Sequence, residues 1–183
     1  NCFALAEATL GAGEGWGTVF GVIMGTGVGG GIVVDGKVLI GRNGIAGEWG
    51  HNVVDPDGEL CYCGRKGCVE TMISGPAIER AYARISGKSA SLAHIVEDHR
   101  SGRDEDASET VRLLCERFGK CLAQVVNVLD PDVIVLGGGL GQIDELYVEG
   151  TFDLKKHVFH EKPNLDVRRP LMGDSAGVFG AAL

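Results

Sequence analysis

Residues 18–40 have the sequence TVFGVIMGTGVGGGIVVDGKVLI, in which two apolar runs enclose a glycine-rich segment. Residues 18–24 are mostly apolar and β-branched, which predicts a strand in the middle of a sheet. A glycine-rich loop over 25–31 and two short strands, 32–34 and 37–40, are expected to follow. Asp35-Gly36 separates these two strands, and both residue types suit the left-handed backbone of a tight hairpin turn. The stretch therefore predicts three meandering strands.

The rest of the chain predicts helices around this meander and a strand–helix alternation after residue 107. Apolar residues recur at helical spacing in 107–129, and the residue before Pro131 ends that helix. This order of elements predicts an α/β fold, with helices packed on a five-stranded mixed sheet. The remaining predicted elements are helices over 2–10, 76–85, 143–160 and 175–183, and strands over 133–136 and 167–171.

Composition and charge limit the classes of protein to consider. The 183 residues are 44% hydrophobic and 23% charged, which suits one domain or one large lobe with a buried core. The net charge of -8 and the lack of a long basic run argue against nucleic acid as a ligand of this half of the protein. No apolar run approaches the roughly 20 residues that span a bilayer, and the start lacks the features of a signal peptide. We therefore expect a cytoplasmic protein that does not bind membranes.

A cluster of metal-binding residue types interrupts the regular pattern between about 41 and 75. His51, Cys61, Cys63 and Cys68 lie close together, with the spacing Cys-x-Cys-x4-Cys. Three thiolates and one imidazole form a closed tetrahedral set, which predicts a structural Zn²⁺ site with no open position for catalysis. Disulfides are the alternative, but a cytosolic chain keeps its thiols reduced. Separate burial is another alternative, which the surrounding glycines and charges disfavour.

Glycine is the most unusual feature of the composition, with 30 residues, about twice the usual share of roughly 7%. Two glycine loops each follow a buried strand, and bare backbone N–H groups there can approach phosphate oxygens. Neither loop has the Gly-Lys-Ser/Thr ending of a Walker A motif, and each alone could be a plain hairpin. At the carboxyl ends of two strands of one sheet, they predict a nucleotide cleft. The residues expected to face ATP are Gly25, Thr26, Gly27, Gly29, Gly30, Gly137, Gly138 and Gly139.

Two glutamates flank the predicted metal loop. Glu48 precedes the histidine, and Glu70 follows the last cysteine. An isolated glutamate is usually just a solvated surface charge. Two carboxylates fixed to one rigid metal-bound loop can instead accept hydrogen bonds from neighbouring sugar hydroxyls. Cys2, Cys115 and Cys121 fall in apolar helical patterns and are expected in the core.

The sequence EWGH at 48–51, followed by CYCGRKGCVE at 61–70, resembles the signature of the ROK family of sugar kinases. The resemblance extends over essentially the whole chain. It implies a ribonuclease-H-like lobe of the actin-like ATPase and hexokinase superfamily, and a homodimer. Glu48, His51 and Glu70 would hold sugar hydroxyls, with His51 bound to zinc through its other ring nitrogen. ATP, accompanied by Mg²⁺, would lie against the glycine loops.

Within the family the chain is most similar to bacterial fructokinases, also described as manno-fructokinases. This similarity implies ATP-dependent phosphorylation of fructose to fructose 6-phosphate. N-acetylglucosamine kinase and glucokinase of the same family are alternatives. A ROK-type transcriptional repressor that responds to sugar is a further alternative, since such proteins share the sugar-binding body. A zinc-stabilised interaction module without catalysis is the third.

The family resemblance also places the chain within a longer protein. Asn1 resembles the last residue of the Asn-Asp-Ala-Asn motif that holds the catalytic aspartate of ROK kinases. The resemblance therefore implies that residues 1–183 form the C-terminal lobe, that the N-terminal lobe is absent from this chain, and that the catalytic base lies just upstream of Asn1. No function is predicted for the polar stretch 87–106.

Overall fold

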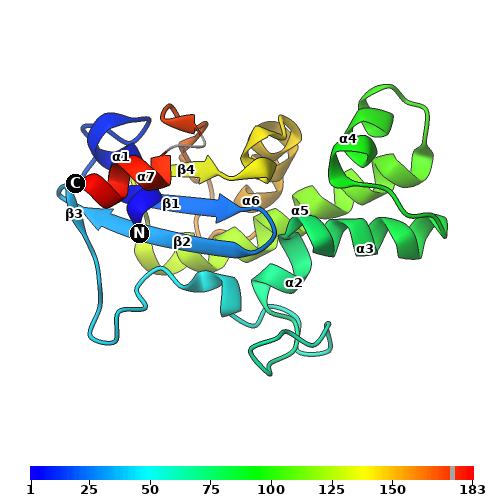
Figure 1. Cartoon of the computed structure of the whole chain (residues 1–183), viewed down its shortest axis with the longest axis horizontal. Helices are drawn as coiled ribbons and strands as arrows, with labels where there is room; N and C mark the ends of the chain where they lie inside the picture. Colours follow the sequence, from blue (N-terminus) through cyan, green and yellow to red (C-terminus); the bar gives the residue numbers. More distant parts are fainter. Residues whose placement is uncertain (174–175) are drawn as a thin grey trace.

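A computed structural model describes residues 1–173 and 176–183 and contains one five-stranded mixed sheet (Figure 1). The strand order is β3-β2-β1-β4-β5. β1 pairs antiparallel with β2 and parallel with β4, so the carboxyl ends of β1 and β4 lie at the same edge. The strands are β1 Thr18–Met24, β2 Val28–Val34, β3 Lys37–Val38, β4 Val133–Gly137 and β5 Val167–Arg168. The predicted five-stranded mixed sheet is confirmed.

The hairpin of β1 and β2 is tighter than the sequence predicts. The two strands pair from Thr18 opposite Val34 to Met24 opposite Val28, which leaves only residues 25–27 for the turn. The expected loop over 25–31 is therefore wrong for its second half, which belongs to β2. The second turn is as predicted, because Asp35 and Gly36 have φ angles of 48° and 73°.

Helices cover both faces of the sheet, and most begin or end close to the predicted positions. α5 starts two residues before the predicted helix, where the Asp104 carboxylate accepts hydrogen bonds from the amides of Asp106 and Ala107. The single helix predicted over 143–160 is wrong, since only 146–155 is helical there. The helices are α1 Cys2–Leu10, α2 Val69–Ile73, α3 Gly75–Ser86, α4 Leu92–Arg100, α5 Glu105–Leu129, α6 Thr151–Lys155 and α7 Ala176–Ala182, with short turns η1 Trp49–His51, η2 Gly139–Gln142 and η3 Leu146–Gly150.

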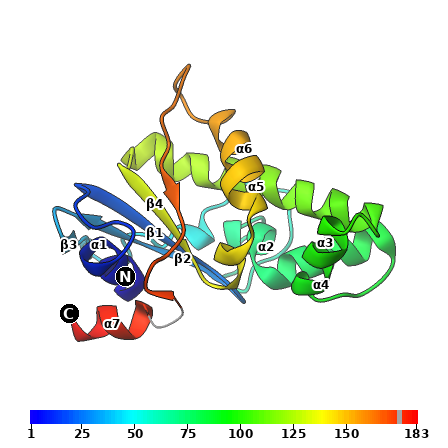
Figure 2. The ribbon, with the colours of Figure 1, turned by 90° about the horizontal axis from the view of Figure 1, so that it is seen from above.

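Alternate side chains of the central strands face two separate apolar layers. Figure 2 shows α5 on one side of the sheet and α1 with α7 on the other. Phe20 and Leu136 belong to the larger core under α5, whereas Val19 and Val135 belong to the smaller core under α1. This alternation is the period of two that a strand buried on both faces requires. Within the described residues, no helix combines the length and the apolar run that crossing a bilayer needs.

The polar stretch without a predicted function contributes to this core. Its central part forms α4, whose Ile95 and Val96 are buried in the larger apolar cluster. Ser91 caps the start of α4 by accepting a hydrogen bond from the amide of His94. α4 is therefore an amphipathic helix, and Ala90 and Leu92 pack partly buried against the same cluster.

A buried carboxylate joins the two ends of the described chain. Glu7 in α1 is 0% exposed. It accepts hydrogen bonds from the amide of Ala12 at 2.9 Å and from the amides of Leu171 at 3.1 Å and Met172 at 2.9 Å. Three N–H donors satisfy this buried charge, so the contact fixes the segment after β5 against α1.

Replacing Glu7 with alanine should destabilise the protein by about 3 kcal/mol or more, because it leaves three inward-facing amides without an acceptor. The measurement is the free energy of unfolding in urea, followed by circular dichroism. Glu14→Ala is the matched control, since Glu14 is exposed, and it should change the free energy by less than about 0.5 kcal/mol. Equal effects of the two substitutions would contradict the role of Glu7.

Candidate functional site

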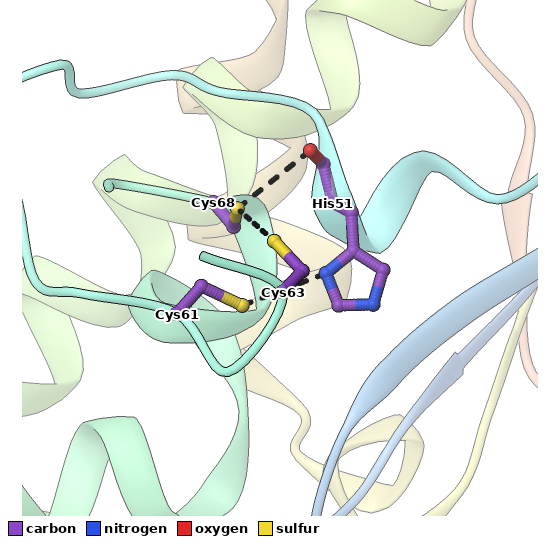
Figure 3. Close-up of side chains that lie close together, drawn as sticks. All are labelled: His51, Cys61, Cys63 and Cys68. Atoms are coloured by element: carbon purple, nitrogen blue, oxygen red, sulfur yellow. Dashed lines mark hydrogen bonds between the residues drawn. The ribbon is translucent and has the colours of Figure 1, made fainter. Parts of the chain in front are cut away.

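The four predicted metal ligands converge on one point beside the sheet (Figure 3). His51 lies at the end of η1, Cys61 and Cys63 lie on the following loop, and Cys68 precedes α2. Two isolated β-bridges close the loop, one between Val53 and Cys68 and one between Leu60 and Lys66. The backbone thus brings residues from both ends of the loop together.

The spacing of the ligand atoms fits a tetrahedral metal ion. All four lie within 4.8 Å of one another. The Cys61 sulfur is 3.5 Å from His51 Nδ1, and the sulfur atoms of Cys63 and Cys68 are 3.6 Å apart. Zinc–sulfur and zinc–nitrogen bonds of standard length place tetrahedral ligands about 3.6–3.8 Å apart. The donor set and its spacing therefore suit Zn²⁺.

The thiols of the cluster differ in their environments. A hydrogen bond from the Arg65 backbone lowers the pKa of Cys63, whereas burial raises the pKa of Cys68. A bound cation would hold both as thiolates. Outside the cluster, burial raises the pKa of Cys115 and of Cys121 to about 12. These two are core residues as predicted, but the expectation for Cys2 is wrong, because Cys2 is exposed at the start of α1.

The second nitrogen of the His51 ring has a partner that the sequence did not indicate. Nδ1 faces the thiols (Figure 3), and Nε2 lies 2.9 Å from the hydroxyl of Tyr62. The two rings meet edge to face, with centroids 5.1 Å apart and an interplanar angle of 87°. The negative charge of Glu70 is the main cause that raises the pKa of Tyr62. The charge of Glu70 therefore acts on the same Tyr62 hydroxyl that contacts His51.

Hydrogen bonds attach the metal loop to the β1–β2 hairpin. The half-buried Glu70 lies in the first turn of α2, and its Oε2 accepts a hydrogen bond of 3.0 Å from the amide of Val28. The indole of Trp49 donates to the carbonyl of Gly29, also at 3.0 Å. Trp49 is buried, and its neighbour Glu48 is exposed. The two predicted sugar-binding carboxylates thus lie on segments fixed directly to the strand that follows the first glycine turn.

The two glycine turns open onto one cavity of about 580 Å³. They meet there because β1 and β4 are adjacent and parallel. Of the predicted ATP-facing residues, Gly25, Thr26 and Gly139 line the cavity. The other walls come from α3 and α4, through residues that include Glu79, Leu92 and Arg100.

The remaining predicted ATP-facing glycines lie outside this cavity lining. Gly29 and Gly30 are paired within β2, and a Cβ atom on Gly27 would lie 2.6 Å from the Glu70 carboxylate. Gly137 ends β4. Gly138 has a φ of 76°, and a Cβ there would lie 2.3 Å from the carbonyl oxygen of Met24. Close backbone packing between the ends of β1 and β4 therefore requires glycine at 138.

Sequence reasoning missed two contributions to the site. Tyr62 lies between two cysteines, and its position in the sequence carries no sign of a contact with His51. Arg100 and Leu92 lie in the polar stretch over 87–106, where helical spacing does not reveal that one end of α4 borders a cavity. Arg100 also forms a two-pronged ion pair with Glu145, with both distances 2.7 Å.

Comparison with known proteins assigns this arrangement to a family. The ROK family model matches residues 1–183, the whole chain. The chain belongs to the ROK family. The resemblance carried by 48–51 and 61–70 is thereby confirmed, as is the actin-like ATPase fold.

Curated ROK relatives are similar along the entire chain. An N-acetylgalactosamine kinase of Shewanella sp. strain ANA-3 is 38% identical over 191 residues, which cover 100% of this chain and 62% of the relative. An N-acetyl-D-glucosamine kinase of Photobacterium profundum is 38% identical over 192 residues, with 63% of that protein covered. The chain thus spans less than two thirds of the length of these relatives.

Solved structures of ROK proteins superpose closely on all or nearly all of the chain. The ROK hexokinase from Thermus thermophilus gives a TM-score of 0.90 at 34% identity, with 61% of that chain covered. A ROK glucokinase from Streptomyces griseus, solved with glucose and AMPPNP, gives 0.87 at 34% identity, with 64% covered. A ROK transcriptional regulator, a homolog of the E. coli MLC protein, gives 0.84 at 31% identity, with 48% covered.

Proposed function

We propose that this chain is the nucleotide- and sugar-holding part of a longer ATP-dependent sugar kinase, called here the complete kinase. One observation carries the proposal: the cavity formed by the two glycine turns and the metal-type loop share the β1–β2 hairpin. Such a hairpin can bring a phosphoryl donor and an acceptor hydroxyl together. Kinases among the curated relatives support this function. The placement of the chain as the C-terminal lobe stays a prediction.

N-acetylated hexosamines are the substrates we propose first. The two relatives described above are named as kinases of N-acetylgalactosamine and N-acetylglucosamine. Fructose, expected from sequence similarity, finds no support in these names, and the N-acetylglucosamine alternative fits better. Glucose follows, because the related Streptomyces griseus enzyme binds it.

In the proposed mechanism, Glu48 and Glu70 accept hydrogen bonds from sugar hydroxyls, and His51 donates one from Nε2. The turn that contains Gly25 and Thr26 lies against the ATP phosphates, Gly139 lies beside the adenosine, and Mg²⁺ accompanies the nucleotide. The sugar hydroxyl oxygen attacks the γ-phosphorus, ADP leaves, and an aspartate expected upstream of Asn1 takes the hydroxyl proton. Zn²⁺, held by His51, Cys61, Cys63 and Cys68, would supply structural order to the loop.

An ADP-release assay on the complete kinase tests this function. It uses ATP with Mg²⁺ and a panel of N-acetylglucosamine, N-acetylgalactosamine, glucose, mannose and fructose, with zinc content measured on the same sample. Selective turnover of the N-acetylated sugars is expected. Turnover of fructose alone would reverse the substrate proposal, and no turnover by folded, zinc-loaded protein would overturn the kinase proposal.

A sugar-responsive transcriptional repressor is the second candidate. The ROK regulator that superposes on this chain supports it, with 48% of that regulator matched. Its test is sugar-dependent binding of the complete protein to DNA without turnover of ATP. We also propose that the protein forms a homodimer. Light scattering on the purified protein measures its molar mass and so tests this.

Glu48→Gln should raise the KM for the sugar by roughly 10- to 100-fold, because it removes one charge-assisted hydrogen bond. The KM for ATP should change little. Asp57→Asn is the matched control, since Asp57 is an exposed carboxylate on the same loop, and it should leave both constants unchanged. Equal increases of both KM values in Glu48→Gln would contradict the assignment of Glu48 to the sugar.

A further inference from the structure

The imidazole of His51 has one nitrogen left for a substrate, and Tyr62 already uses it. Nδ1 lies 3.5 Å from the Cys61 sulfur, on the side of the metal ligands. With a metal on Nδ1, the neutral ring carries its hydrogen on Nε2. That N–H donates to the Tyr62 hydroxyl oxygen, 2.9 Å away. One N–H makes one good hydrogen bond, so a sugar hydroxyl can bind there only after Tyr62 has left.

The side chain of Tyr62 can rotate away from His51 without disturbing the surrounding structure. It is 83% exposed. In the part of the chain that the structure describes, the His51 ring is the one hydrogen-bond partner of its hydroxyl. Its backbone, by contrast, lies between Cys61 and Cys63, which the metal would hold in place. The ring can therefore rotate away about its side-chain torsions while the loop keeps its shape.

We propose that Tyr62 is an affinity-determining residue of the sugar site, which competes with the substrate hydroxyl for the N–H of His51. This inference rests on the proposed role of His51 in holding the sugar. Sugar binds only to the fraction of molecules in which Tyr62 has turned away, so the apparent affinity is reduced by that fraction. In the absence of sugar, the Tyr62 hydroxyl accepts the hydrogen bond from His51 Nε2, so this N–H group keeps a partner.

Tyr62→Phe tests this competition, since it removes the hydroxyl and keeps the ring. In the complete kinase, the KM and the calorimetric Kd for N-acetylglucosamine should both fall by roughly two- to tenfold, the range that one hydrogen bond supplies. The kcat, the KM for ATP and the zinc content should stay unchanged. Phe159→Ala is the control: Phe159 is 97% exposed and belongs to neither the metal loop nor the cavity, so its loss should alter none of these values.

Each other outcome overturns the competition in a recognisable way. A higher KM for the sugar in Tyr62→Phe would show that the Tyr62 hydroxyl contacts the bound sugar. An unchanged Kd for the sugar would show that the hydroxyl has no part in the sugar site. A loss of zinc would make Tyr62 a residue that orients the metal ligand. If the wild type binds the sugar without phosphorylating it, the kinase proposal fails, whereas a tighter Kd in Tyr62→Phe still supports the inference. If no sugar of the panel binds, both proposals fail.

Discussion

Replacing Cys68 with serine, or stripping the metal with a chelator, should lower kcat/KM for the sugar by at least about 100-fold in the complete kinase, because the metal supplies most of the free energy that orders the loop. Structural zinc contributes on the order of 10–16 kcal/mol of binding in small sites of this donor type. The loop has little core of its own, as the 70% exposure of Leu60 shows. Loss of the metal should therefore release His51 and the segments that carry Glu48 and Glu70.

Three measurements check this prediction: steady-state kinetics, metal content by atomic spectroscopy, and limited proteolysis within residues 52–68. Cys2→Ser is the matched control, since Cys2 is an exposed cysteine in α1, outside the cluster. It should keep metal and activity. A metal-free Cys68→Ser protein with a normal KM for the sugar would show that the loop holds its shape without zinc.

Replacing Gly67 with alanine should weaken zinc binding by about 100-fold or more, because the added carbon cannot fit. Its Cβ would lie 1.5 Å from the carbonyl oxygen of Asp55, in a backbone with a φ of +62°. Real Cβ atoms do not approach a carbonyl this closely, so the loop must move. The residue next to it is Cys68, which loses its position when the loop moves.

Gly64 provides the comparison within the same turn. It also has a left-handed backbone, with a φ of +88°, but no atom lies within 4 Å of its Cβ position. Gly64→Ala therefore adds only the conformational cost of about 1 kcal/mol and should weaken zinc binding by less than about tenfold. Competition with a chromophoric chelator measures both affinities. Similar losses in the two variants would show that backbone strain matters and the contact with Asp55 does not.

The features that the sequence predicted correctly are those with a local pattern. The central strands β1 and β4 follow from their apolar, β-branched runs, and the convergence of His51, Cys61, Cys63 and Cys68 follows from their spacing. The hairpin at Asp35-Gly36 follows from the backbone that these residues tolerate. Each of these patterns involves residues close in the chain, so contacts between distant segments do not change the structure that the pattern predicts.

The features that the sequence did not predict depend on contacts between distant segments. Three glycines at 29–31 suggested a loop because glycine is rare in strands. They belong to β2 because they pair with β1. Two of them also lie where the strand has no room for a side chain: Cβ atoms on Gly30 and Gly31 would lie 2.9 Å from the Trp49 and Ala4 side chains, respectively. The second partner of His51, and the wall that α4 gives to the cavity, likewise required the folded chain.

The hydrogen bonds between the metal loop and the β1–β2 hairpin limit how the sugar specificity of one ROK protein could be transferred to another. A graft of residues 41–75 alone would carry Trp49 and Glu70 to a host hairpin that must offer the Gly29 carbonyl and the Val28 amide at the same positions. The host would also need glycine at 30, where the Trp49 ring and the Gly47 carbonyl leave no room for a side chain. The exchangeable unit is therefore discontinuous and contains residues 18–34 together with the loop. Chimeras with both pieces from one donor should keep that donor's sugar preference, whereas those with mismatched pieces should lose it.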